Sequence, residues 1–103
     1  MTRDFYTTRS AMSVFSPAQI AENLATLPGW KHEGGNLVRN LTFSDFREAM
    51  SFVNSVAALA ERAGHHPDID IRYNKVHLAL SNHDAGGITE KDFALAAEIE
   101  DTL

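Results

Sequence analysis

The sequence predicts an α+β two-layer sandwich: a four-stranded, mainly antiparallel sheet covered on one face by three helices, in the order α-β-β-α-β-β-α. Two observations support this class. Two pairs of short segments alternate apolar and polar residues, and three longer segments carry apolar residues at helical spacing. Strands that alternate need cover on one face, and amphipathic helices supply it. Because nothing closes such a sheet, we expect an edge strand to pair with a partner chain.

The first helix is expected to begin at Ser16, because Ser16 and Gln19 have the spacing of a capping box. Pro28-Gly29 is expected to end it. We therefore expect residues 1–15 to be a flexible N-terminal extension and residues 16–103 to form a single domain.

The first hairpin is expected to start near Trp30 and to turn at Gly34-Gly35-Asn36 into a strand over residues 37–43. Ser44 is expected to cap the longest helix, which ends before Gly64. Its expected apolar stripe is Phe46, Met50, Phe52, Val53, Val56, Ala57, Leu59, Ala60 and Ala63.

The second hairpin is expected to place Ile69, Ile71 and Tyr73 on one face and to turn at Asn74-Lys75. The last helix is expected to be capped by Thr89, with Asp92 as the capping-box partner. Its expected inner face is Leu95, Ala96, Ile99 and Leu103.

The composition limits the classes of function. At 103 residues, with 44% hydrophobic and 22% charged residues, the chain fits one globular domain. No apolar run approaches the ~18–20 residues of a membrane span, so we expect no membrane segment. A net charge of −5 without a stripe of Lys and Arg argues against direct nucleic-acid binding. The lack of cysteine excludes disulfides and thiol catalysis and fits a cytoplasmic protein, with the nucleus as the other compartment open to it.

Three of the five histidines lie at the two ends of the second hairpin. His65 and His66 precede its first strand, and His83 with Asp84 follows its second. An antiparallel hairpin should therefore bring both clusters together, with Glu61 one helical turn before His65. Imidazole titrates near pH ~6.5, so it can both donate and accept a proton. Such a constellation suits elimination, hydration or isomerisation, with carboxylates fixing the tautomers.

Simpler interpretations stand beside this one. His65 could only contact the last carbonyls of the helix, Glu61 could be a solvated charge, and capping alone is a sufficient job for Asp92. A zinc site of His65, His66 and His83 with Glu61 or Asp84 is the rival functional reading. Neighbouring residues rarely ligate one metal well, and no His-x-x-x-His spacing is present, so we expect no metal.

Several spaced motifs resemble the pterin-4a-carbinolamine dehydratase family. They are Gly64-His65-His66-Pro67, Tyr73-Asn74-Lys75-Val76, His83-Asp84-x-Gly86-Gly87-Ile88-Thr89 and Asp92, with Trp30 after Gly29. The strong match covers residues 61–100, and the helix and strand plan extends it over 16–103. One position departs from the pattern, since many members have Trp where this chain has Ile69, and any aromatic stacking there is lost.

The resemblance implies a hydro-lyase that converts 4a-hydroxytetrahydropterin to quinonoid dihydropterin in tetrahydrobiopterin recycling, with no metal or redox cofactor. It implies that His65, His66 and His83 are the active-site histidines and that Glu61 and Asp92 support them. We expect His65 and His83 to transfer protons and His66 to hold the ring, although opposite tautomers would exchange these roles.

The resemblance also implies which residues contact the pterin and which partners the chain has. The expected contacts are His65, His66, Pro67, Asn82, His83, Asp84 and Ala85. The expected assembly is a homo-oligomer, commonly a tetramer built from dimers. The alternative function is that of a non-catalytic binding module, because an animal member of the family also serves as a dimerisation cofactor of a transcription factor.

Overall fold

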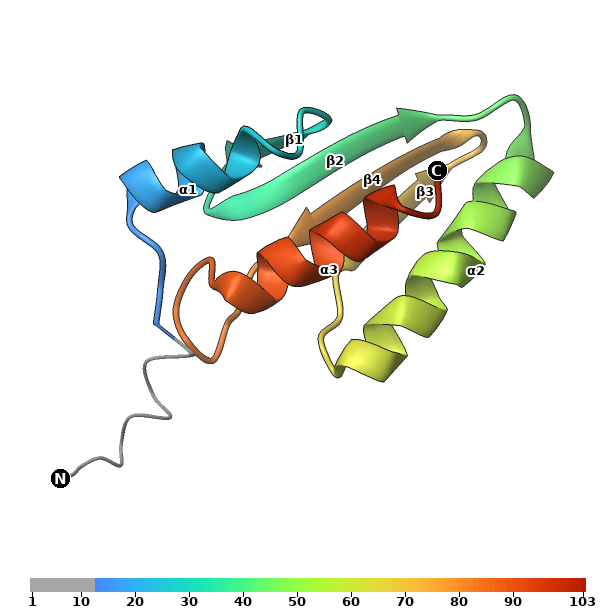
Figure 1. The fold of residues 1–103 in the computed structure, drawn as a ribbon. Helices are drawn as coiled ribbons and strands as arrows, with labels where there is room; N and C mark the ends of the chain where they lie inside the picture. The colour runs from blue at the N-terminus through green and yellow to red at the C-terminus, as the bar shows by residue number, and fades with distance from the viewer. Residues whose placement is uncertain (1–12) are drawn as a thin grey trace, which may run out of the picture.

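Four strands form one antiparallel sheet, and three helices pack against one of its faces (Figure 1). The computed structural model describes residues 13–103. The elements are α1 (Pro17–Leu24), β1 (Trp30–Glu33), β2 (Asn36–Thr42), α2 (Phe46–Ala63), β3 (Asp68–Arg72), β4 (Lys75–Leu80) and α3 (Glu90–Glu100). The strand order is β1-β2-β4-β3, which leaves β1 and β3 at the edges. The predicted fold class and element order are confirmed.

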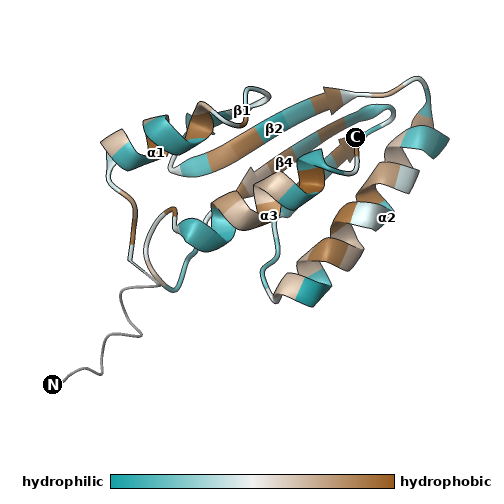
Figure 2. Ribbon diagram, viewed as in Figure 1, coloured by the Kyte–Doolittle hydropathy of each residue, from teal (hydrophilic) through white to brown (hydrophobic). Residues whose placement is uncertain are grey.

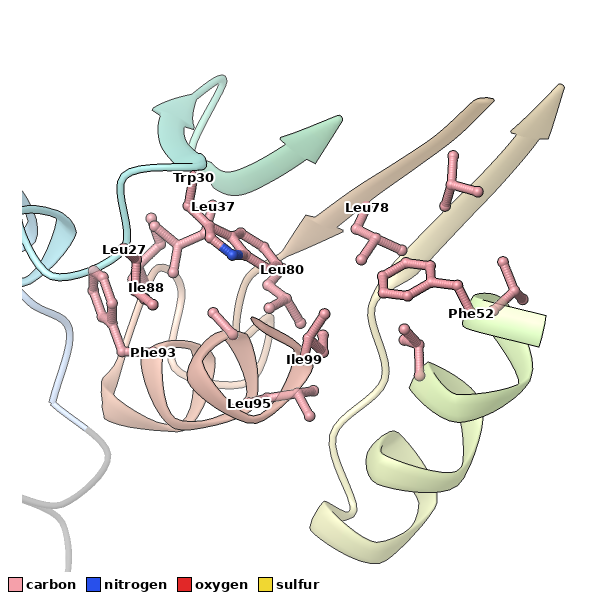
Figure 3. Packing of buried hydrophobic residues seen from close by; sticks show 14 of the residues in the cluster. Leu27, Trp30, Leu37, Phe52, Leu78, Leu80, Ile88, Phe93, Leu95 and Ile99 are labelled. Carbon is pink, nitrogen blue, oxygen red and sulfur yellow. The ribbon is translucent and has the colours of Figure 1, made fainter. Parts of the chain in front are cut away.

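One hydrophobic core joins the sheet to the helices (Figure 3). Leu37, Leu78 and Leu80 of the sheet are fully buried, as are Leu95 and Ile99 of α3. Figure 2 shows hydrophobic residues along the middle of α2 and hydrophilic ones at its two ends. Within residues 13–103, no helix combines the length and apolarity that crossing a bilayer requires.

A polar cluster fastens the last turn of α3 to the first hairpin. Glu100 Oε2 accepts hydrogen bonds from Trp30 Nε1 at 2.9 Å and from Arg39 Nε at 2.7 Å. The Arg39 side chain lies so close to Gly29 that a Cβ there would meet its Cζ at 2.5 Å. These contacts hold α3 in place at the end opposite to Asp92.

The cap of α2 was predicted one residue too early. Asp45, not Ser44, is the N-cap, and its carboxylate accepts a hydrogen bond from Glu48 N at 2.8 Å. Ser44 instead donates through its backbone and its hydroxyl to the Glu48 carboxylate. Both residue types cap well, and the one with the extended backbone beside the first turn, Asp45, takes the position.

The buried stripe of α2 is narrower than predicted. Its buried residues are Ala49, Phe52, Val53, Val56 and Ala60. Phe46, Ala57 and Ala63 are exposed. At about 100° per residue, Phe46 and Ala57 fall at the margin of the arc that faces the sheet, and Ala63 is the last helical residue.

Three further boundaries differ from the prediction. Helix α1 ends at Leu24, before Pro28-Gly29, because the chain turns at Ala25. Leu103 lies beyond α3 and is exposed. Tyr73 is exposed in the β3–β4 turn, since Arg72 pairs with Lys75 and the turn falls one residue earlier than predicted.

The flexible extension expected over residues 1–15 lies outside the described residues except for its last three. There Phe15 N donates to Ile88 O at 2.8 Å, and the Phe15 ring stacks on Phe93.

Candidate active site

The site lies where both ends of the β3–β4 hairpin meet the end of α2. In the hairpin Asp68 pairs with Ala79, so the residues before β3 lie opposite those after β4. A pocket of about 230 Å³ is lined by Gly64, His65, His66, Ser81, Asn82, His83 and Asp84. The structure therefore brings the two predicted histidine clusters to one pocket.

Gly64 sets the direction in which the chain leaves α2. Its φ of 64° is left-handed, which glycine adopts at little cost and which ends the helix. The backbone N–H of His65 still donates to Ala60 O at 3.1 Å. This hydrogen bond holds His65 next to the last turn of α2. From His65 the chain continues toward Pro67 and β3.

His65 is held by a buried carboxylate. Its Nε2 lies 2.5 Å from Asp92 Oδ1, and Asp92 is fully buried at the first turn of α3. The second oxygen, Asp92 Oδ2, accepts the backbone N–H of Thr89 at 2.8 Å, which closes the predicted capping box. Asp92 therefore completes the cap of α3 through one oxygen and contacts His65 through the other.

This geometry determines the tautomer of His65 when Asp92 is ionised. A carboxylate can only accept hydrogen bonds, so Nε2 must carry a proton and donate it. In the neutral imidazole Nδ1 then has a free lone pair. Carboxylate–histidine pairs of this kind fix the tautomer and the orientation of the ring. Nδ1 of the neutral His65 ring is therefore left as a hydrogen-bond acceptor.

His66 has a similar partner in a very different environment. Its Nε2 lies 2.7 Å from Glu61 Oε2. The His66 and Glu61 side chains are 62% and 78% exposed, whereas that of His65 is 11% exposed. Water screens the outer pair, so its partners orient each other less firmly.

His83 is exposed at the rim of the pocket. Its side chain has no hydrogen bond or ion pair to any residue in 13–103. Nothing in this part of the chain fixes its tautomer, so it can meet a substrate as donor or acceptor.

Of the other residues predicted to contact the pterin, some line the pocket and others do not. Asn82 is buried, bridges to Gly87, and accepts the Ala85 N–H through Oδ1 at 3.2 Å. Asp84 is exposed and lines the pocket, whereas Pro67 and Ala85 are half-buried and do not line it.

Two pocket residues were not predicted as site residues. Gly64 and Ser81 both line the pocket. The register of the hairpin could have predicted Ser81. Asp68 pairs with Ala79, so two residues further toward the open end of the hairpin Ser81 lies opposite His66.

No three His, Cys, Asp or Glu side chains within residues 13–103 are grouped closely enough to hold a metal ion.

Residues 13–102 match the family described as Pterin 4 alpha carbinolamine dehydratase. The chain belongs to this family. A relative from Acidobacterium capsulatum, named "Putative pterin-4-alpha-carbinolamine dehydratase", is 59% identical over 92 residues, which are 89% of this chain and 100% of that relative. A relative of the same name from Chloroflexus aurantiacus is 58% identical over 92 residues, 89% of this chain and 99% of its own.

Two solved structures share the fold of this family member. A transcriptional coactivator/pterin dehydratase from Brucella melitensis superposes with a TM-score of 0.83 at 30% identity, covering 86% of this chain and 97% of its own. A pterin dehydratase-like protein identified as a RuBisCO assembly factor in the alpha-carboxysome gives a TM-score of 0.61 at 26% identity, covering 71% of this chain and 87% of its own. Solved structures with this fold therefore carry names of both catalytic and assembly roles.

Proposed function

We propose that this chain catalyses the dehydration of 4a-hydroxytetrahydropterin to quinonoid dihydropterin. Membership of the dehydratase family supports the reaction class. The observation that carries the proposal is that His65, paired with the buried Asp92, lines one pocket together with His83. Capping of α3 alone does not account for the histidine on the second oxygen of Asp92, whereas a carboxylate that orients a proton-transferring imidazole does.

The reaction requires one proton to leave N5 and one to reach the departing C4a hydroxyl. The C4a–O bond breaks, the N5–H electrons form the new C=N bond, and water leaves. His65 takes the N5 proton at Nδ1 because Asp92 holds its Nε2–H and stabilises the imidazolium that forms. His83 gives its proton to the hydroxyl, which can then leave as water.

The remaining residues bind and orient the ring. His66 lines the pocket and pairs with Glu61, and it holds the pterin ring. Asn82 and Asp84 offer an amide and a carboxylate to the polar edge of the pterin, and Pro67 and Ala85 shape the backbone on either side. The chain needs no metal or redox cofactor for these steps, because both protons move between imidazole and substrate.

The chain is also proposed to act as a homo-oligomer in the cytoplasm. Strands β1 and β3 both present an unpaired edge within the described residues, and such edges favour pairing with another copy.

A second function, that of a binding module, has support in the relatives. One structural neighbour is titled a transcriptional coactivator and another a RuBisCO assembly factor. A non-catalytic module would place its activity on outer surfaces and would not depend on His83.

One assay separates the two functions. An aromatic amino-acid hydroxylase generates 4a-hydroxytetrahydropterin, and its decay is followed by absorbance with native protein and with His83→Ala. The enzyme reading predicts acceleration by native protein and a loss of about 10²–10⁴-fold in the variant, with unchanged circular dichroism and oligomer size. No acceleration over spontaneous water loss, with assembly intact, leaves the binding module as the function.

A further inference from the structure

The place of His83 in the pocket depends on the backbone that carries it, because its side chain has no hydrogen bond or ion pair to any residue in 13–103. His83 is the first of four turn residues, 83–86, and a bridge between Asn82 and Gly87 closes this turn. Whatever fixes the shape of the turn therefore fixes where the imidazole meets a substrate.

Asn82 collects the backbone hydrogen bonds of the turn. Its N–H donates to Gly87 O at 2.9 Å. Its carbonyl oxygen lies within 3.1 Å of three donors, the N–H groups of Ala85, Gly86 and Gly87. A carbonyl oxygen has only two lone pairs, so it cannot satisfy three N–H groups fully. The turn therefore needs further acceptors.

The side chain of Asn82 supplies one of these acceptors. Its Oδ1 accepts the Ala85 N–H at 3.2 Å, and the Gly86 N–H is shared with His83 O at 3.2 Å. The bond from Oδ1 to Ala85 spans the backbone of His83 and Asp84, which is how asparagine side chains hold turns. Because Asn82 is only 6% exposed, water competes little for this bond.

The two ends of the Asn82 amide have different environments. Oδ1 is engaged in the turn, whereas Nδ2 has no partner among residues 13–103, and Asn82 lines the pocket. Nδ2 is therefore the atom available to a pterin. Within the same part of the chain, no other side chain hydrogen-bonds to turn residues 83–86.

We propose that Asn82 is a positioning residue for His83: its Oδ1 holds the turn in the shape that keeps His83 in one pocket with His65. The inference rests on the proposed function, in which His83 is the proton donor. It separates two effects of Asn82, because Oδ1 acts through His83 on the chemical step and Nδ2 acts on substrate binding.

The test compares two substitutions of Asn82. Asn82→Ala removes both ends of the amide, so kcat should fall about 10- to 100-fold through displacement of His83. KM should rise about two- to tenfold through loss of one hydrogen bond. Asn82→Ser keeps a neutral acceptor that closes such turns more weakly. Its kcat should stay within about fivefold of native, while its KM rises as in Asn82→Ala. Asn82→Leu, which has a similar shape and no acceptor, replaces Asn82→Ala if the alanine variant unfolds.

Asn74→Ala is the matched control. Asn74 Nδ2 donates to Phe43 O at 2.8 Å in the β3–β4 turn, at the opposite end of the same hairpin. This substitution also removes one side-chain hydrogen bond from a turn, and it should leave kcat and KM unchanged. A loss of kcat equal to that of Asn82→Ala would show that the loss of stability accounts for both, and would overturn the proposal.

NMR supplies a readout that does not depend on turnover. Asn82→Ala should lower the order parameter of the His83 backbone N–H and speed exchange of the Ala85 N–H by about tenfold, whereas Asn82→Ser should keep both near native. Unchanged NMR values in Asn82→Ala, or an equal loss of kcat in the alanine and serine variants, overturn the positioning role. Absence of turnover by native protein, with the NMR changes present, overturns the proposed reaction and leaves the role of Asn82 in the turn intact.

Discussion

Replacing Asp92 by asparagine separates the structural job of this residue from its chemical one. The side-chain oxygen of asparagine can still accept the Thr89 N–H, so the amide NH₂ must face His65 Nε2. Nε2 then becomes an acceptor and the ring proton moves to Nδ1. His65 loses the lone pair with which it takes the substrate proton, although every heavy atom stays in place.

The magnitudes follow from burial and hydrogen bonding. Asp92→Asn keeps both contacts, so we expect a loss of only about 1 kcal/mol in the free energy of unfolding. We expect turnover to fall by about 10²–10⁴-fold. Asp92→Ala removes the acceptor of the Thr89 backbone N–H and leaves a buried ring nitrogen of His65 unpaired, for about 2–4 kcal/mol in all.

Urea unfolding followed by circular dichroism measures the stability of each variant, and the dehydration assay measures turnover. Ser16→Ala is the control. It removes the N-cap of α1, where Ser16 Oγ accepts a hydrogen bond from Gln19 N at 3.2 Å, and Ser16 is far from the pocket residues in sequence. It should cost about 1 kcal/mol and leave turnover unchanged. Turnover of Asp92→Asn within a few-fold of native protein would refute the assignment of His65 Nδ1 as the base.

Three further substitutions test other parts of the structure. Glu100→Ala should destabilise the fold by about 1–2 kcal/mol in urea unfolding, because the buried Trp30 indole loses its acceptor; an unchanged midpoint would show that the cluster contributes nothing. Gly64→Ala should lower Tm by about 4–8 °C, since a Cβ at φ 64° costs about 1 kcal/mol, and an unaltered melting curve would argue against the left-handed turn. Glu61→Gln should change the unfolding free energy by no more than about 0.5 kcal/mol, because its contact with His66 is mostly exposed; turnover should fall less than about tenfold, and a larger loss would place Glu61 in the chemistry.

Local patterns predicted the features that depend on neighbours in the sequence. Helix ends depend on a few consecutive residues. The structure has the predicted caps at Ser16 and Thr89 and the predicted end of α2 at Gly64. The prediction that His65 lies near the segment after β4 depended only on antiparallel pairing of the two strands. It was therefore unaffected by placing the turn one residue too late.

Features that depend on distant contacts could not be predicted in the same way. The pairing of His65 Nε2 with Asp92 joins residues 27 apart, and the Trp30–Glu100 bond joins residues 70 apart. The strand order β1-β2-β4-β3 places β4 in the centre, and only the assembled core determines that order. Phe46 and Tyr73 are exposed despite their apolar character, because Phe46 lies at the margin of the α2 face that packs on the sheet and Tyr73 lies in the β3–β4 turn.

The most direct test of the central claim is the first-order decay rate of 4a-hydroxytetrahydropterin as a function of protein concentration, in the presence of a chelator. The account predicts a rate that rises linearly with native protein and a slope that disappears in both His65→Ala and His83→Ala. A rate that stays at the spontaneous value, or a slope that survives in both variants, would contradict a histidine dehydratase.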